Sequence, residues 1–309
     1  MKIMIIGAGG VGGYIAGRLA YEFPNEITLI ARGNQLEAIK KNGLTIIEDN
    51  NQGYSVHPAL CTDEPEQAGL QDVIFVCTKS YGLDAAIEQI KPCIGPDTLL
   101  LPLLNGISAR RVIRSHTKSG VALDGCIYIF SQIDAPGVIR KVGSVCKVFM
   151  GIAPEETNTK ALETMRMLCD MLCAGGIDTK ISGEVVTMLW QKWILMISNA
   201  QAAAYFNKPI GEVREDPEKF KFVLDLLEEA LAVAKLENIE LPLDVREQIK
   251  TTIFSLSYES TPSLARDLNT PGKATELDIF CGELIRLAKK HKIDAPNNQK
   301  ILNRFADRV

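Results

Sequence analysis

The chain has 309 residues, of which 46% are hydrophobic and 23% are charged, and its formal net charge is −4. A chain of this length is too long for one ordinary core, so we expect about two domains. The mildly acidic balance argues against a broad nucleic-acid-binding face or a basic membrane-binding face. With 24 glycines and 14 prolines, the composition gives no sign of disorder or of a fibrous repeat.

No segment of the sequence predicts export or membrane insertion. Residues 1–6 are too short for the core of a signal peptide and lead directly into a glycine cluster. The most membrane-like stretch, residues 193–206, covers 14 residues and includes polar ones, whereas a bilayer span takes about 20 apolar residues. We therefore expect a cytoplasmic protein that has neither a membrane nor a nucleic acid as its partner.

The eight cysteines lie mostly within apolar runs and form no Cys-x-x-Cys pair. Cys169 and Cys173 are four positions apart in a helical stretch, and no histidine lies near them to complete a zinc site. They are predicted to be buried thiols, and no metal is expected. His57, His116 and His291 lie in polar segments away from any motif and are predicted to be solvated.

The first half of the chain alternates apolar strand-like runs with amphipathic segments. This alternation, with crossover-length connections, predicts a parallel doubly wound sheet. The strand-like runs are residues 2–6, 27–31, 73–77 and 98–104, and the amphipathic stretches are 11–21, 34–42, 83–91 and 106–114. Further strand-like pieces follow at residues 121–131, 137–142 and 145–152.

From about Gly183 the hydrophobic periodicity becomes helical and stays so to the end. The long periodic segments are residues 184–206, 217–236, 243–256 and 276–290. We therefore predict an α/β protein with an N-terminal Rossmann-type, doubly wound domain over residues 1–181 and a C-terminal all-helical domain over residues 182–309. The functional site is expected in the cleft between these two domains.

The sharpest local motif is Gly7-Ala8-Gly9-Gly10-Val11-Gly12, which directly follows the first strand and opens a helix. Glycine is needed there for a tight turn, for close approach of a pyrophosphate and for close helix–strand packing. The helix N-terminus then offers amide donors to the phosphates. This strand–turn–helix context favours a dinucleotide site over a merely structural glycine turn.

The residue after the second strand bears on which dinucleotide binds. NAD sites usually place an acid there to hold the ribose diol, but here the strand at residues 27–31 is followed by Arg32. A guanidinium suits a 2′-phosphate, which a carboxylate would repel. Arg32 therefore favours NADP(H), with a solvated loop arginine as the alternative.

Two more polar residues follow predicted strands, at the edge of the sheet where ligands of this fold bind. Lys79 ends the run at residues 73–78, and Asn105 follows the run at residues 98–104. From position alone, each is equally compatible with contact to a cofactor and with exposure to solvent.

Together these motifs resemble the ketopantoate reductase (2-dehydropantoate 2-reductase) family. The resemblance includes the Gly-Ala-Gly-Gly-Val-Gly-Gly start, Arg32, the Thr78-Lys79 pair and the Leu104-Asn105-Gly106 turn. It continues with Trp190-Gln191-Lys192 and Thr275-Glu276-Leu277-Asp278, so it covers essentially the whole chain in order.

The resemblance implies NADPH-dependent reduction of the 2-oxo group of ketopantoate to pantoate, a step toward pantothenate and coenzyme A. It implies that Lys192 is the catalytic lysine and Glu276 its partner. Asn105 and Lys79 would lie between nicotinamide and substrate, and Ser263 near the substrate carboxylate. The implied NADP(H)-binding residues are Gly7, Ala8, Gly9, Gly10, Val11, Gly12, Arg32, Lys79, Asn105 and Glu276.

The chemistry of such a reduction explains why a lysine is suited to it. Hydride arriving at a ketone carbon leaves negative charge on the oxygen, which calls for a proton donor aimed at that oxygen. Lys192 interrupts an apolar helix between Trp190 and Trp193, where an unpaired buried charge would be costly, and Glu276 could be its partner. Alternatively, Lys192 extends to the surface and Glu276 merely favours a helix N-terminus.

The sequence departs from the family at two positions, because Met196 and Ala200 stand where members often carry asparagines. Asn199, seven positions after Lys192, would return to nearly the same face of a regular α-helix and is a candidate substitute for binding substrate. The leading hypothesis is therefore a ketopantoate reductase. The alternatives are a reductase of another branched 2-oxo acid and an NADP(H) sensor without turnover. Whether the apolar C-terminal helices form a homodimer face or one domain's core is left open.

Overall fold

The computed structural model describes residues 1–48, 53–154 and 156–308. Within this part of the chain two compact units are found, and each is described by itself. The first comprises Met1–Leu104 and Ser108–Val185, and the second comprises Asn105–Ile107 and Val186–Val309. The main division lies between Val185 and Val186, a few residues beyond the predicted boundary after residue 181.

The first unit contains the predicted parallel sheet, which has six strands in the order β5-β2-β1-β6-β7-β8. This order, with the chain reversing direction across the sheet at β1, is that of a doubly wound dinucleotide-binding fold. Every pairing within the sheet is parallel. Its strands are β1 (Ile3–Ile6), β2 (Ile27–Ile30), β5 (Leu60–Thr62), β6 (Gln71–Val76), β7 (Ile94–Pro102) and β8 (Val121–Ala122).

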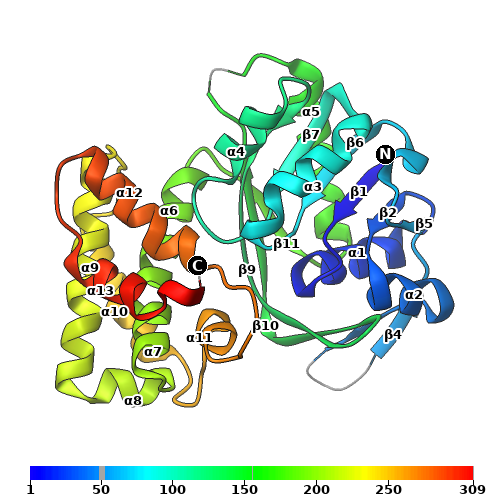
Figure 1. Ribbon diagram of the computed structural model, residues 1–309. Helices are drawn as coiled ribbons and strands as arrows, with labels where there is room; N and C mark the ends of the chain where they lie inside the picture. The colour runs from blue at the N-terminus through cyan, green and yellow to red at the C-terminus, as the bar shows by residue number, and fades with distance from the viewer. Residues whose placement is uncertain (49–52, 155, 309) are drawn as a thin grey trace. The chain divides into compact units, whose positions relative to one another are not determined.

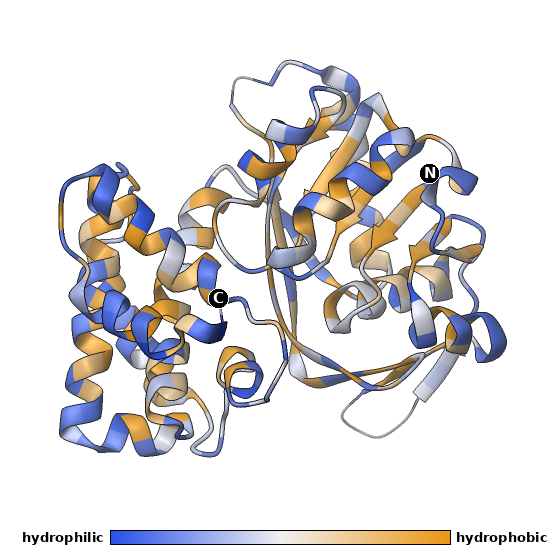
Figure 2. Cartoon of the chain, viewed as in Figure 1, coloured by the Kyte–Doolittle hydropathy of each residue, from blue (hydrophilic) through white to orange (hydrophobic). Residues whose placement is uncertain are grey.

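Helices cover both faces of this sheet, because alternate strand residues project to opposite sides. Ile3 and Ile5 of β1 pack in one core with α1 and α5, while Met4 and Ile6 pack in another with α3 and α4. The strands are coloured as strongly hydrophobic in Figure 2, as expected for strands buried on both faces. The helices of this unit are α1 (Gly10–Glu22), α2 (Gly33–Asn42), α3 (Leu83–Ile90), α4 (Ala109–His116) and α5 (Thr159–Ala174).

The strand-like pieces predicted at residues 121–131, 137–142 and 145–152 correspond largely to two long strands, β9 and β10, but the second sheet that they help to form in the same unit was not predicted. A long antiparallel pair, β9 with β10, is extended by β3, β4 and β11, and the path through the sheet is β11-β10-β3-β4. Figure 1 shows β9 and β10 as a long curved ribbon. Its strands are β3 (Leu44–Ile47), β4 (Gly53–Val56), β9 (Asp124–Ala135), β10 (Val138–Gly151) and β11 (Asp178–Ile181).

The second unit is helical, as predicted, and its core is built from the apolar faces of its helices. Two short π-helical turns, Met196–Ala200 and Asp278–Gly282, interrupt it. The first connects α6 to α7 and the second leads into α12. The helices are α6 (Val185–Leu195), α7 (Gln201–Phe206), α8 (Ile210–Glu215), α9 (Pro217–Leu236), α10 (Val245–Ser255), α11 (Ser263–Leu268), α12 (Glu283–Lys290) and α13 (Pro296–Arg304).

Candidate functional site

The glycine turn between β1 and α1 is packed so closely that side chains cannot replace its first and last glycines. Gly7 has φ +104°, in the region that favours glycine, and a Cβ atom there would lie 2.7 Å from the carbonyl oxygen of Cys77. A Cβ atom at Gly12 would lie 2.1 Å from the carbonyl oxygen of Gly7. These contacts bring α1 tightly against β1 and β6.

The two middle glycines of the turn differ in how closely other atoms approach them. A Cβ atom at Gly9 would meet nothing within 4 Å, whereas one at Gly10 would lie 2.6 Å from the carbonyl oxygen of Ser131 in β9. Gly9 precedes the first turn of α1 and has no side chain to cap the amide groups there. Helix-terminal amides without a side-chain cap, next to open space, are suited to bind phosphate oxygens.

Two buried hydroxyl oxygens near this turn have no hydrogen-bond partner among the described residues. They are Oγ1 of Thr78, which follows the Cys77 carbonyl, and Oγ of Ser131. A buried hydroxyl without a partner costs about 1–3 kcal/mol. A polar ligand at the glycine turn would relieve that cost, so these residues fit a bound dinucleotide. Nothing in the sequence singled out Ser131, because it is an ordinary strand residue.

Arg32 lies at the end of β2, as the sequence indicated, and directly precedes α2. Its side chain is exposed, and its guanidinium donates to the side-chain carbonyl of Gln89 in α3. Gln89 in turn donates to the backbone carbonyl of Asp63, at 2.6 Å. Gln89 therefore orients the guanidinium of a side chain that remains exposed.

Lys79 is exposed and directly precedes a single 3-10 turn, Ser80–Gly82, at the carboxyl end of β6. It lies on the same edge of the parallel sheet as the glycine turn. This is the edge at which ligands of doubly wound sheets bind. The structure thus brings the first four predicted features, the turn, Arg32, Thr78 and Lys79, to one edge of one sheet.

In the helical unit, Glu276 is buried, with 4% of its surface exposed. Its Oε2 atom accepts a hydrogen bond of 3.2 Å from Nδ2 of Asn105, which is only half-buried. Gly106 follows with φ +95°, and a Cβ atom there would already contact Ile279 at 3.4 Å. The three-residue segment from Asn105 thus lies against the chain that carries Glu276.

Lys192 lies half-buried in α6, and in the sequence it is flanked by two buried tryptophans. The Trp190 and Trp193 rings pack edge-to-face, with centroids 5.1 Å apart. The Trp193 indole N–H donates to the carbonyl oxygen of Ile279, at 2.7 Å. This bond ties the helix that carries Lys192 to the π-helical turn that begins two residues after Glu276.

The π-helical turn at Met196–Ala200 alters the helix face on which Asn199 was expected to lie. A seven-residue spacing returns to the same face only in a regular α-helix, whereas a π turn has i→i+5 bonds and shifts the following residues around the axis. The expected alignment of Asn199 with Lys192 therefore does not follow from spacing. Asn199 is buried, with 6% of its surface exposed. Ser263, the first residue of α11, is half-buried.

The cysteines are not all buried, contrary to the prediction. Five of the cysteines are buried, but Cys61 and Cys169 are only half-buried and Cys173 is exposed. The buried face of α5 contains Leu168 and Leu172, so the next residue after each is turned by about 100° away from the core. Within the described ranges, no group of three or more His, Cys, Asp and Glu side chains is arranged to hold a metal.

His116 is more than a solvated surface residue, because its ring bridges two carboxylates of α3. Its Nδ1 atom lies 2.6 Å from Glu88 and its Nε2 atom 2.8 Å from Asp84. The hydrogen bonds to Glu88 and then to Asp84 raise the pKa of His116 above its ordinary value. His291 similarly pairs with Glu237.

No described helix is both long and apolar enough to cross a membrane.

The chain matches two family descriptions in succession. Residues 3–154 match "Ketopantoate reductase PanE/ApbA", and residues 184–308 match "Ketopantoate reductase PanE/ApbA C terminal". It is 29% identical over 296 residues to YkpB, an uncharacterized oxidoreductase of Bacillus subtilis, covering 96% of this chain and 95% of that one.

Relatives with a named reaction also align along nearly the whole chain. A 2-dehydropantoate 2-reductase of Mesorhizobium japonicum is 26% identical over 313 residues, covering 94% of this chain and 93% of the relative. The solved structure of 2-dehydropantoate 2-reductase from Porphyromonas gingivalis is 28% identical, with a TM-score of 0.84 and 99% of both chains covered. Members of this family are NAD(P)H-dependent. The chain therefore belongs to the ketopantoate reductase family, and it is an oxidoreductase acting on CH–OH groups.

Proposed function

We propose that this protein reduces the 2-oxo group of 2-dehydropantoate to pantoate with NADPH, a step toward pantothenate and coenzyme A. The observation that carries the proposal is the arrangement in the helical unit. A half-buried lysine, Lys192, lies on a helix that Trp193 ties to the turn after the buried Glu276. Glu276 in turn accepts a hydrogen bond from Asn105. A lysine, a carboxylate and an amide held in this way suit the reduction of a polar carbonyl compound.

The first unit would hold the cofactor. Amide groups at the start of α1, next to Gly9, would bind the pyrophosphate. Arg32, oriented by Gln89, would pair with the 2′-phosphate and so favour NADPH. The hydroxyls of Thr78 and Ser131, which have no partner among the described residues, would find one on the bound dinucleotide. When bound, NADPH supplies a hydride to the carbonyl carbon of the substrate.

The second unit would supply the proton and hold the substrate. As the carbonyl oxygen gains negative charge, the Lys192 ammonium donates a proton to it. The Trp190 and Trp193 rings pack against each other and help to hold the helix that carries Lys192. One carboxylate oxygen of Glu276 accepts the hydrogen bond from Asn105, and the carboxylate would also accept one from the substrate hydroxyl. We assign Ser263 to the substrate carboxylate, Asn199 to a hydroxyl of the substrate, and Lys79 to the junction of nicotinamide and substrate.

The first test is NADPH oxidation at 340 nm with 2-dehydropantoate, a panel of other 2-oxo acids and an NADH control. We expect turnover with 2-dehydropantoate and a clear preference for NADPH. Lys192→Ala should lower kcat by about 10²–10⁴-fold, the range for loss of a general acid, and leave NADPH binding unchanged. Lys235→Ala, at an exposed lysine of α9, is the matched control. Full turnover in Lys192→Ala would remove this lysine from the mechanism.

A second substrate is favoured by one observation. Ala200 is buried with 1% of its surface exposed, and Met196 is half-buried, so neither offers a polar side chain to a substrate hydroxyl. A reductase of another branched 2-oxo acid, with fewer hydroxyls, would suit such surroundings. Turnover in the same panel with only a hydroxyl-free 2-oxo acid would select this alternative. Tight NADPH binding without turnover of any 2-oxo acid in the panel would instead favour an NADP(H) sensor.

A further inference from the structure

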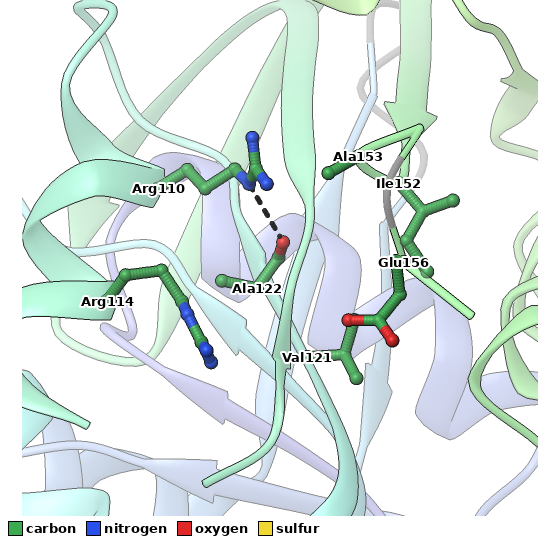
Figure 3. Close-up of a pocket in the computed structure, with 7 residues that line it drawn as sticks. All are labelled: Arg110, Arg114, Val121, Ala122, Ile152, Ala153 and Glu156. Atoms are coloured by element: carbon green, nitrogen blue, oxygen red, sulfur yellow. Dashed lines mark hydrogen bonds between the residues drawn. The ribbon is translucent and has the colours of Figure 1, made fainter. Parts of the chain in front are cut away.

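The α/β unit contains a small cavity that the proposed reductase chemistry does not use. Its volume is about 170 Å³. Figure 3 shows side chains from α4 on one side and from the segment after β10 on the other, with β8 between them. The lining residues are Arg110, Arg114, Val121, Ala122, Ile152, Ala153 and Glu156.

The register of the sheet places this cavity away from the dinucleotide edge. Val121 pairs with Leu99, which pairs with Val73, which pairs with Ile3, the first residue of β1. The glycine turn follows the last residue of β1, and β8 lies three strands away from it, about 14 Å across the sheet. The cavity is therefore near the amino ends of the strands, whereas ligands of this fold bind at the carboxyl ends.

Two arginines line one side of the cavity, and Arg110 already pairs with Asp124. Arg110 and Arg114 are four residues apart on α4 and so project from the same helix face. The Arg110 Nε–H donates to the carbonyl oxygen of Ala122 at 3.2 Å, and its Nη1 atom pairs with the Asp124 carboxylate at 3.4 Å. Arg114 donates to the carbonyl oxygen of Gly120 at 2.9 Å. A guanidinium has five donors, so the bond to Gly120 orients Arg114 and leaves other donors for a ligand.

Glu156 forms the negative side. Its Oε1 atom accepts from the backbone amides of Thr157 and Asn158, at 3.1 and 3.0 Å, which fixes the carboxylate at the cavity wall. Among the residues drawn in Figure 3, the one hydrogen bond joins Arg110 to Ala122. Glu156 and the arginines thus face the cavity without bonding to each other.

We propose that this cavity binds a small branched aliphatic α-amino acid of about the size of valine. Its carboxylate would pair with Arg114, and its ammonium with Glu156. Its branched side chain would pack on Val121, Ile152 and Ala153. An apolar cavity of about 150 Å³ is known to admit benzene, so one of this volume has room for such a ligand.

The test is isothermal titration calorimetry of the full protein with L-valine and three analogues that each change one feature. The analogues are 3-methylbutanoate, which lacks the ammonium, isobutylamine, which lacks the carboxylate, and 2-hydroxy-3-methylbutanoate, which replaces the ammonium by a hydroxyl. We expect L-valine to bind most tightly, with a Kd in the millimolar range or below. Glu156→Gln should weaken L-valine by about 10-fold, the loss of one charge-assisted bond, and leave 3-methylbutanoate unchanged.

Arg114→Gln should weaken both L-valine and 3-methylbutanoate, and it can keep a hydrogen bond to the Gly120 carbonyl. Arg111→Gln is the matched control, because Arg111 is exposed on the same helix and does not line the cavity. Circular dichroism would confirm that each variant is folded. Three results would overturn the proposal: no binding of L-valine at tens of millimolar, binding unaffected by both cavity variants, and tighter binding of the hydroxy acid than of L-valine. None of these readouts depends on reductase activity.

Discussion

The side-chain amide of Asn105 donates a hydrogen bond of 3.2 Å to Glu276, a residue 171 positions later in the chain. Glu276 is almost fully buried, so this bond satisfies one oxygen of a carboxylate that has little access to water. Hydrogen bonds to charged groups are worth about 1.5–3 kcal/mol, more than those between neutral groups. The contact is therefore a good candidate for a measurable energetic coupling.

A double-mutant cycle with Asn105→Ala and Glu276→Gln should measure that coupling. We expect a coupling free energy of about 1–2 kcal/mol in the free energy of unfolding from urea titrations, because Asn105→Ala removes the hydrogen bond and Glu276→Gln leaves at most a neutral one. Each variant should also lower kcat in the NADPH assay. Effects that add to within about 0.5 kcal/mol would show that the bond contributes little. Asn303→Ala, at an exposed asparagine of α13, is the control for amide removal.

Arg32→Ala should change the cofactor preference. The variant removes a guanidinium that would pair with the 2′-phosphate, so we expect NADPH affinity to fall by about 10–100-fold and NADH affinity to change little. Gln89→Ala should give a smaller loss in the same direction, because Gln89 only orients Arg32. Fluorescence titration with both cofactors measures each effect. Lys40→Ala, an exposed cation of α2, is the control, and an equal loss there would point to a general charge effect.

Glu229 should be important for the stability of the helical unit. Its two carboxylate oxygens accept the backbone amides of Asn297 and Asn298 at the start of α13, at 2.8 and 3.1 Å, and both side-chain amides as well. Glu229→Gln places a donor against these donors, so we expect a loss of about 2–4 kcal/mol in the free energy of unfolding. Glu228→Gln breaks only an exposed ion pair with Arg246, and should cost less than about 1 kcal/mol. Similar losses in the two variants would contradict the prediction.

His116 should make stability depend on pH. Hydrogen bonds to Glu88 and Asp84 raise its pKa in the folded state, so its contribution is fully present below the unfolded pKa of about 6.5. The contribution is lost as the pH rises through the raised folded value. The Tm difference between the wild type and His116→Gln should therefore be larger at pH 6 than at pH 9, and smaller in high salt. An equal difference at both pH values would mean that the charge on His116 does not stabilise the fold.

The sequence predicted the parallel sheet and most of the long helices because their signals are local. The periodic segment at residues 217–236 became α9 with the same bounds, Pro217–Leu236. The glycine turn could also be predicted from the sequence, since Gly7 and Gly12 are needed for contacts within a few residues of the motif and with the end of β6. The six-residue helices α8 and α11 were not predicted, because six residues give too little periodicity.

Other features depend on partners that are distant in sequence. The second sheet forms because β10 pairs with β3, about ninety residues earlier, and with β11. No local pattern in the residues 44–47 reports such a partner. The π-helical turn at Met196–Ala200 likewise occurs in a sequence that continues a regular helical pattern, so the position of Asn199 could not be predicted from spacing.

The three residues Asn105–Ile107 belong to the helical unit, although the chain on both sides of them belongs to the α/β unit. A cut between Val185 and Val186 would therefore not yield two complete units. The C-terminal fragment would retain Glu276 without the amide that donates to it. When the α/β unit unfolds, disordered chain flanks this segment on both sides, so keeping the segment on the helical unit costs additional loop-closure entropy. The connection from β7 to α4 thus links the stabilities of the two units through the covalent chain.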